Sequence, residues 1–242
     1  APAVGAWVAV WGGWRANLAL LACIGAVVLT LSTLLLPETH RERTPLPGIR
    51  PMAQSFSRLL ALPAFRGYAI GGCCSSTSMY AYFSASPFIF TEVLHRPVQD
   101  LGFAQMLVSI AFAVGSFSSS RLVRRLGMIR VARQGNLVML AGACEILLMH
   151  VTGHLDVFTF MAGILLGAMG SGYASPAAAA GAIGADPKAI GAASGLYGSM
   201  QMAFATLCTV IVSVAGGSPV TAVVGVLIGA TLVGQAALVY GE

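Results

Sequence analysis

Charged side chains are what this sequence has little of. Asp, Glu, Lys and Arg make up 9% of its 242 residues, whereas hydrophobic residues make up 57% and the mean hydropathy is +0.84. Soluble domains carry about 25% charged residues. So few charges cannot cover a soluble surface, so we expect an integral membrane protein. The net charge of +5 lies in short clusters between apolar runs, a pattern that calls for no nucleic-acid partner.

Paired cysteines and catalytic motifs are also lacking. The sequence contains no HExxH motif, no Ser/His/Asp set and no paired acids inside an apolar run. The cysteines lie singly or side by side in apolar stretches, without the spacing of a zinc site or a disulfide framework. They are Cys23, Cys73, Cys74, Cys144 and Cys208. We therefore expect no enzyme activity, no metal and no cofactor.

Long apolar runs dominate what is present. Seven are long enough to cross a bilayer as helices, which takes about 20 residues, and none shows the alternating ten-residue pattern of barrel strands. They are residues 17–36, 67–91, 101–120, 131–151, 157–180, 190–214 and 220–240. Residues 1–11 are too short to span, and the pair Gly12–Gly13 interrupts them. We interpret them as the broken end of a helix that begins upstream, in an all-α, N-terminally truncated bundle.

These runs divide the chain into three regions. Residues 1–36 end an N-terminal half, residues 37–66 form a central loop with a short amphipathic helix near 52–62, and residues 67–242 form a six-helix transmembrane domain. A long loop ahead of six helices is typical of transporters built from two six-helix halves. Asp100 and Asp156 precede apolar runs, so each is expected to be an N-cap.

The basic residues predict the orientation, because cytoplasmic loops carry the excess of Lys and Arg. One set of loops carries only Arg15 and Arg96. The alternate set carries eleven: Arg41, Arg43, Arg50, Arg58, Arg66, Arg121, Arg124, Arg125, Arg130, Arg133 and Lys188. We therefore expect these loops and the C-terminus to be cytoplasmic, and His95 and Asp156 to face outward.

A family resemblance is carried by four stretches. The order PxxG at Pro2, GWR at Gly13 and LPET at Leu36 resembles the fifth and sixth helices of major facilitator superfamily drug:proton antiporters. The stretch SASPFIFTEVLHRPVQDLGFAQ, residues 84–105, resembles the bicyclomycin-resistance/CflA type. The resemblance implies a major facilitator-like helical bundle in a bacterial inner membrane, surrounded by lipid.

The same resemblance implies what the protein moves and what drives it. It implies export of small lipophilic, drug-like substrates, with antibiotic resistance as the result, and protons as the coupling ion, so that the proton gradient replaces a cofactor as energy source. A missing N-terminal half or another copy of the chain is the implied partner. The acid that couples proton movement in this family usually lies in the first helix, which this chain does not contain.

Two family motifs fall on named residues. Pro2 and Gly5 resemble the antiporter motif, in which small residues let helices approach closely. The loop SRLVRRLGMIRVAR resembles the superfamily's cytoplasmic loop motif through Arg124, Arg125, Gly127 and Arg130. Gly127 allows a tight turn, and the arginines can meet helix carbonyls or anionic lipid headgroups. Ordinary small-residue packing and positive-inside charge are the alternative interpretations.

Aromatic and polar side chains inside the spans are candidates for a substrate cavity. They are Tyr80, Tyr82, Phe83, Ser84, Phe88, Tyr173, Tyr197 and Gln201. Pro87 is expected to break the first of these helices. Helix packing and interfacial tyrosine belts are the alternatives. The spacings Gly163/Gly167 and Gly191/Gly195 predict close helix packing.

Glu145 is the one carboxylate well inside a span. An acid there is a candidate for binding a proton or a cationic substrate, since ionising it in hydrocarbon is costly. Snorkelling, or pairing with His150 on the same helix, is the alternative. Three functions remain open at this point: a proton-coupled efflux transporter, a metabolite transporter of the same superfamily, and a non-transporting remnant or half-protein.

Overall fold

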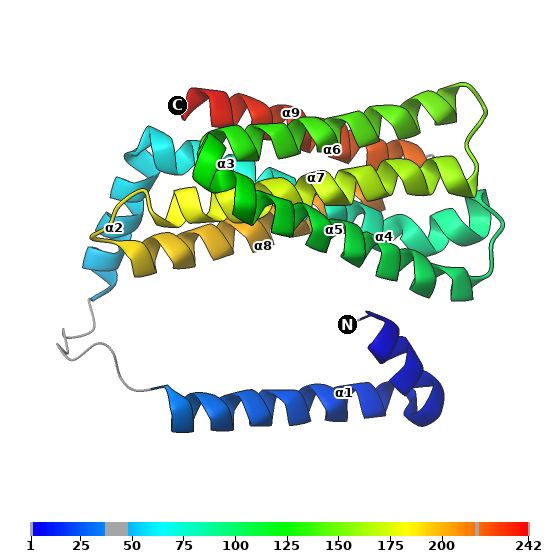
Figure 1. The fold of residues 1–242 in the computed structure, drawn as a ribbon, viewed down its shortest axis with the longest axis horizontal. Coiled ribbons are helices and arrows are strands. Elements are labelled where there is room, and N and C mark those ends of the chain that lie inside the picture. Colours follow the sequence, from blue (N-terminus) through cyan, green and yellow to red (C-terminus); the bar gives the residue numbers. More distant parts are fainter. Residues whose placement is uncertain (1, 37–47, 216–217, 242) are drawn as a thin grey trace. The chain divides into compact units, whose positions relative to one another are not determined.

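A computed structural model describes residues 2–36, 48–215 and 218–241 of the chain (Figure 1). Every regular element within these residues is a helix, which confirms the prediction of an all-α membrane protein. The chain forms two compact units, Ala1–Arg50 and Pro51–Glu242. Residues 37–47, which include most of the LPET motif and the first part of the central loop with Arg41 and Arg43, lie outside the described residues.

The first unit is built on helix α1, Pro2–Leu35, which bends at the predicted glycine pair. Gly13 has φ 69° and ψ −175°, a conformation that a residue with a side chain rarely adopts. The side-chain amide of Asn17 donates to the carbonyl of Gly5 across the bend, at 3.0 Å. Beyond the bend, Gly12–Leu35 is long and apolar enough to cross a membrane.

The second unit begins with the amphipathic helix α2, Ile49–Ala61, which covers the predicted short helix. Leu59 on its inner face is fully buried and packs with Phe65 and Tyr197. Arg58 on the same helix lies 3.6 Å from Asp186, which is 7% exposed; this is the one ion pair found among the described residues. Leu59 and Arg58 together attach α2 to the bundle.

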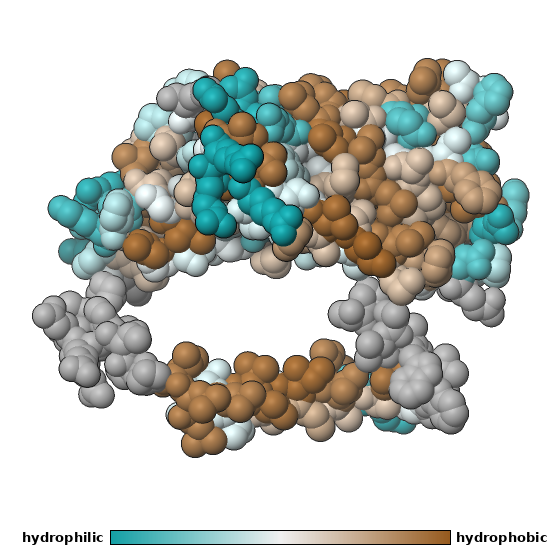
Figure 2. Space-filling model, in the orientation of Figure 1, coloured by the Kyte–Doolittle hydropathy of each residue, from teal (hydrophilic) through white to brown (hydrophobic). Residues whose placement is uncertain are grey.

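Seven α-helices and one π-helical turn follow in the described part of this unit. They are α3 (Pro63–Thr77), α4 (Met79–Phe88), η1 (Ile89–Val93), α5 (Val98–Leu126), α6 (Met128–Val151), α7 (Val157–Ile183), α8 (Ile190–Val214) and α9 (Pro219–Tyr240). The helices α5, α6, α7, α8 and α9 are each long and apolar enough to span. Figure 2 shows hydrophilic residues gathered towards the two ends of this unit, with hydrophobic residues over its middle.

The predicted span 67–91 lies in α3, α4 and η1. Only Ser78 separates α3 from α4, and its φ of −59° and ψ of −28° remain helical, so the interruption is one of hydrogen bonding and not of chain direction. Pro87 lies inside α4, which changes to the π-helical turn η1 directly after Phe88. The carbonyl of Pro87 accepts the hydroxyl of Thr91 at 2.8 Å in this turn, in the way that side-chain hydroxyls and local π turns re-satisfy the backbone near a membrane proline.

Helix α7 packs closely against α5 and α6 through glycines. A Cβ on Gly142 of α6 would meet the carbonyl oxygen of Gly163 on α7 at 2.5 Å, so the two backbones touch there. Gly163 therefore serves the close packing that its spacing predicted. Gly191 and Gly195 of α8 face open space instead, with nothing within 4 Å, so the packing predicted for that pair is wrong in this unit.

The two predicted N-caps differ in outcome. Asp156 caps α7, because its carboxylate accepts the backbone N–H of Thr159 at 2.7 Å while the Thr159 hydroxyl accepts the Asp156 N–H at 2.9 Å. Asp100 is not a cap, since α5 begins two residues earlier and Pro97 takes that position. The predicted turn at Gly127 is confirmed: its φ of 82° lets α6 begin directly after α5 ends.

Replacing Asp156 by Ala is expected to lower the melting temperature of the purified protein. The N–H and hydroxyl of Thr159 lower the pKa of the Asp156 carboxyl, so the cap is strongest above the ordinary carboxyl range and weakens as the pH falls through it. The loss in D156A should therefore shrink in acid. Asp100→Ala is the matched control, and an equal loss there would contradict the capping role.

Candidate functional site

A cavity of about 320 Å³ opens between α3, α4, α5 and α7 of the second unit. It is lined by Ser76, Met79, Tyr80, Phe83, Val108, Ser109, Phe112, Ala168 and Ser171. None of these residues is charged. Aromatic rings and hydroxyl groups on an apolar wall are suited to binding a flat or lipophilic molecule with one or two polar groups.

Tyr80 and Phe83 supply the aromatic wall of this cavity. Their rings meet edge to face, with centroids 6.1 Å apart and planes at 89°. Each ring is about two-fifths exposed, so an aromatic face remains available to a ligand. Both lie in the first turns of α4, directly after Ser78, and three residues apart they share one face of the helix.

Gln201 reaches the cavity through Ser76. The Gln201 side-chain amide donates to the Ser76 hydroxyl at 2.9 Å, and this hydroxyl donates to the carbonyl of Gly72 at 2.7 Å. The chain of bonds joins α8 to α3 and aligns the hydroxyl that lines the cavity. The amide of Gln201 thus finds the partner that an amide in hydrocarbon needs.

A second polar network lies beside the helix break. The Ser171 hydroxyl donates to the carbonyl of Ser75 at 2.6 Å. The Ser75 hydroxyl lies 2.7 Å from the Gly71 carbonyl and 2.8 Å from the side-chain oxygen Oδ1 of Asn136. Both oxygens are acceptors for its one proton, which they share. These bonds tie α3, α6 and α7 together where α3 ends.

The other cavity candidates lie elsewhere in the unit. Tyr82 is fully buried in the core beside Phe160, with ring centroids 6.2 Å apart. Tyr173 lines a separate cavity between α5, α6 and α7 and bonds to Gln134 at 3.2 Å. Tyr197 is buried with its hydroxyl beside Gly72.

Ser84 and Phe88 on α4 also lie outside the lining. The Ser84 hydroxyl bonds to the carbonyl of Ala81 on its own helix at 3.0 Å, and Phe88 is 56% exposed. Of the eight predicted residues, the structure therefore brings Tyr80 and Phe83 to the cavity wall and Gln201 to its edge.

Sequence reasoning missed the lining residues Ser109, Phe112 and Ser171. Serines are common in membrane helices, where the hydroxyl often bonds back to its own helix, as Ser109 does to Gln105 at 2.9 Å. Ser171 differs because its hydroxyl crosses to another helix. Only the three-dimensional packing separates these two cases.

Comparison with known proteins decides the family. Residues 1–208 match the family described as Major Facilitator Superfamily. The chain belongs to the Major Facilitator Superfamily. A bicyclomycin resistance protein homolog of Haemophilus influenzae is 26% identical over 136 residues, which are 54% of this chain and 34% of that relative. The matched part is thus about a third of the relative's length.

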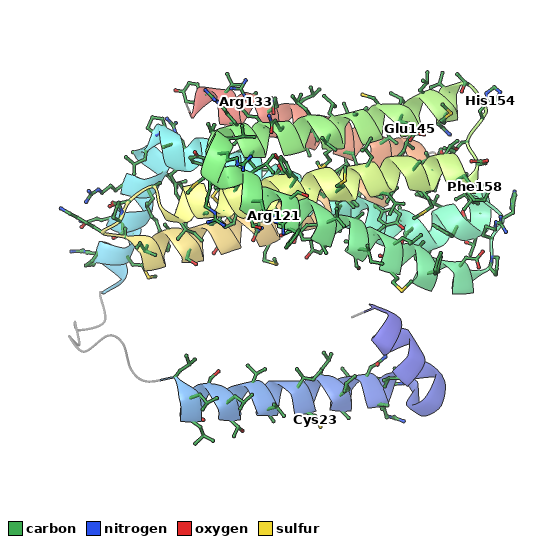
Figure 3. The ribbon with its side chains drawn as sticks, viewed as in Figure 1. Cys23, Arg121, Arg133, Glu145, His154 and Phe158 are labelled. Atoms are coloured by element: carbon green, nitrogen blue, oxygen red, sulfur yellow. The ribbon has the colours of Figure 1, made fainter. Side chains whose placement is uncertain are left out.

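The residues predicted to form the superfamily's cytoplasmic loop motif lie at one end of the second unit. Arg124 and Arg125 are in the last turn of α5 and Arg130 is in the first turn of α6, all three exposed. Figure 3 shows Arg121 and Arg133 towards this same end, and His154 and Phe158 at the other. Of the two residues predicted to belong to an antiporter motif, Pro2 begins α1 and the carbonyl of Gly5 accepts the bond from Asn17.

Glu145 lies within α6, against α7. Its Oε2 atom is buried, and among the described residues it has no hydrogen-bond partner. A Cβ on Gly163 would collide with this oxygen, so Glu145 occupies the space that the glycine leaves. The predicted alternative of a pair with His150 is not seen: His150 Nε2 lies 3.5 Å from the Thr221 hydroxyl instead.

Proposed function

We propose that this protein exports small lipophilic molecules in exchange for protons, by alternating access, in a bacterial inner membrane. The observation that carries the proposal is the uncharged cavity walled by Tyr80 and Phe83, with the hydroxyl of Ser76 aligned by Gln201. Membership of the Major Facilitator Superfamily and similarity to a bicyclomycin resistance protein homolog support it. The described lining offers no charge for an anionic metabolite.

The proposed orientation of the chain rests on the charges of the loops. Eleven of the thirteen Lys and Arg residues fall in alternate loops, which supports a cytoplasmic position of these loops and of the C-terminus by the positive-inside rule. The cavity has a wall from α3, α4, α5 and α7. We propose that the facing wall comes from the remainder of a longer protein or from another copy of the chain, which makes alternating access a movement of two halves.

Transport into proteoliposomes tests this function. The protein, reconstituted together with whatever supplies its facing half, is expected to move a lipophilic fluorescent cation such as ethidium against its gradient when a proton gradient is imposed. A protonophore should abolish the movement. Dye movement that continues in the presence of the protonophore would exclude proton exchange. Uptake of an anionic metabolite in place of the dye would favour the alternative function, a metabolite transporter.

Replacing Tyr80 by Ala is expected to weaken substrate binding about tenfold, because it removes one half of the aromatic wall. Binding is measured by quenching of substrate fluorescence in detergent. Phe158→Ala is the matched control, since this ring is 77% exposed at the start of α7 and outside the cavity. Equal affinity in Y80A and the unchanged protein would place the substrate elsewhere.

A further inference from the structure

Glu145 combines features that a structural acid does not need. It lies on α6 at the contact with α7, where its Oε2 atom is buried and has no partner among the described residues (Figure 3). Gly142 and Gly163 bring the two backbones together at the same level. That oxygen is shielded from the solvent and has no donor among the described residues, so the packed arrangement favours the protonated, neutral acid.

The helices around Glu145 supply no counter-charge. Helices α7 and α9 pack most closely on α6, and neither contains Asp, Glu, Lys, Arg or His; their titratable groups are Tyr173 and Tyr240. On α6 itself the neighbours are Cys144 and His150. The charged residues of α3 and α5 lie at the ends of those helices: Arg66, Asp100, Arg121, Arg124 and Arg125. Nothing in these helices fixes Glu145 as a permanent anion.

The depth of Glu145 gives a proton a short route. It lies six residues before Val151, the last residue of α6, which is about 9 Å at 1.5 Å per residue. His150 lies between Glu145 and the end of α6, with its Nε2 atom 3.5 Å from the Thr221 hydroxyl. Figure 3 shows His154 at this end of the unit. By the charge rule this is the outward end, from which protons enter in an exchange for exported substrate.

We propose that Glu145 is a proton-binding site of the transport cycle, a proposal that rests on the proposed function. On loading, a proton from the outer water forms an O–H bond at the Glu145 carboxylate, and the neutral acid packs against Gly163. On release, the α6–α7 contact opens, the O–H bond breaks, and the proton passes to water on the cytoplasmic side. No other reactant takes part.

Helix α7 connects this site to the cavity. Gly163 touches Glu145, while Ala168 and Ser171 further along the same helix line the substrate cavity. Ser171 also holds the carbonyl of Ser75 at the helix break. A change of charge at Glu145 therefore alters the position of a helix that substrate also contacts, which is the physical connection that exchange of proton and substrate requires.

Carbodiimide labelling tests the site without any transport. Dicyclohexylcarbodiimide reacts with protonated carboxyl groups in apolar surroundings, and mass spectrometry locates the adduct. We expect Glu145 to be labelled near neutral pH, with labelling that falls as the pH rises and that added substrate reduces. Glu92, which is exposed at the end of the broken span, is the internal control and should stay unlabelled. Absence of label on Glu145 at every pH would overturn the proposal.

Glu145→Gln tests the role in coupling, because the amide keeps the shape of the neutral acid and cannot release a proton. E145Q is expected to fold, to exchange substrate down its gradient within about twofold of the unchanged protein, and to lose gradient-driven accumulation at least about tenfold. Glu92→Gln should behave like the unchanged protein. Accumulation that survives in E145Q would overturn the proton site. If the unchanged protein moves no substrate, the proposed function fails, while the labelling result still decides whether Glu145 binds a proton.

Discussion

Replacing Gly115 by Leu is expected to prevent the second unit from reaching its folded state. Gly115 on α5 lies directly against the backbone of α7, where a Cβ would overlap the carbonyl oxygen of Met169 and lie 2.9 Å from the nitrogen of Tyr173. On the other side of the same crossing, a Cβ on Gly172 would overlap the carbonyl oxygen of Phe112. Two helix backbones are thus in contact with no side chain between them.

The size of the effect follows from which atoms collide. A flexible side chain can move aside from an added methyl group, but the backbone of a helix in the middle of a bundle cannot. The cost is therefore expected at or beyond the upper end of the range for overpacking, about 3 kcal/mol or more. Such a loss is a large fraction of the stability of a typical domain, about 5–15 kcal/mol, and the variant should aggregate or be degraded.

Gly102→Leu is the control on the same helix. Gly102 has open space around it, with nothing within 4 Å of a built Cβ, so G102L should give normal yield and a normal elution peak in size-exclusion chromatography. Expression level and melting temperature of both variants measure the difference. Normal folding of G115L would mean that α5 and α7 lie further apart than the structure has them.

Asn136→Asp is expected to give the second-largest loss. Asn136 is 1% exposed, and its amide bonds to Ser75 beside the helix break. The substitution replaces a neutral group by an acid near the middle of a span, where an ionised side chain costs about 2.5–3.5 kcal/mol. The melting temperature should drop strongly at neutral pH. It should recover in part in acid, because the folded protein then takes up a proton and the charge is removed.

Asn136→Leu separates charge from hydrogen bonding. Leucine has nearly the shape of asparagine and removes only the polar bond, for which about 0.6–1 kcal/mol is expected inside a membrane. The melting temperature of N136L should lie between those of N136D and the unchanged protein. Its dependence on pH should be the same as that of the unchanged protein. A pH response in N136L equal to that in N136D would show that the charge at this position is not the cause.

The sequence was sufficient for the elements that follow from local chemistry. The kink at Gly13, the turn at Gly127 and the cap at Asp156 each depend on one residue whose conformational or hydrogen-bonding preference is strong. The interruption at Ser78 could not be predicted in this way, because the local breaker in the sequence is Pro87. Near the interruption, the hydroxyl of Ser171 on another helix donates to the carbonyl of Ser75, a contact between positions far apart in the sequence.

The residues of the candidate site could likewise be predicted only in part from the sequence. Composition predicted that aromatic and hydroxyl side chains near residue 80 would face a cavity, and Tyr80 and Phe83 do. Tyr82 lies between them in sequence, but the helical period turns it into the core beside Phe160. Which face of α4 is inward depends on its packing, which is mainly against α8 and α9, and these helices lie more than a hundred positions further along the sequence.

The single-residue connection at Gly127 has a mechanical consequence. Helices α5 and α6 end and begin on either side of this residue, so they cannot slide past or separate from each other at that end. Under the proposed transport function, the two helices move together at this end, and their relative movement is largest at the opposite end, towards which Glu145 lies. Spin labels on Leu122 and Met128 should therefore keep one distance when substrate or a proton gradient is added, while labels near the far ends of the two helices report the proposed motion.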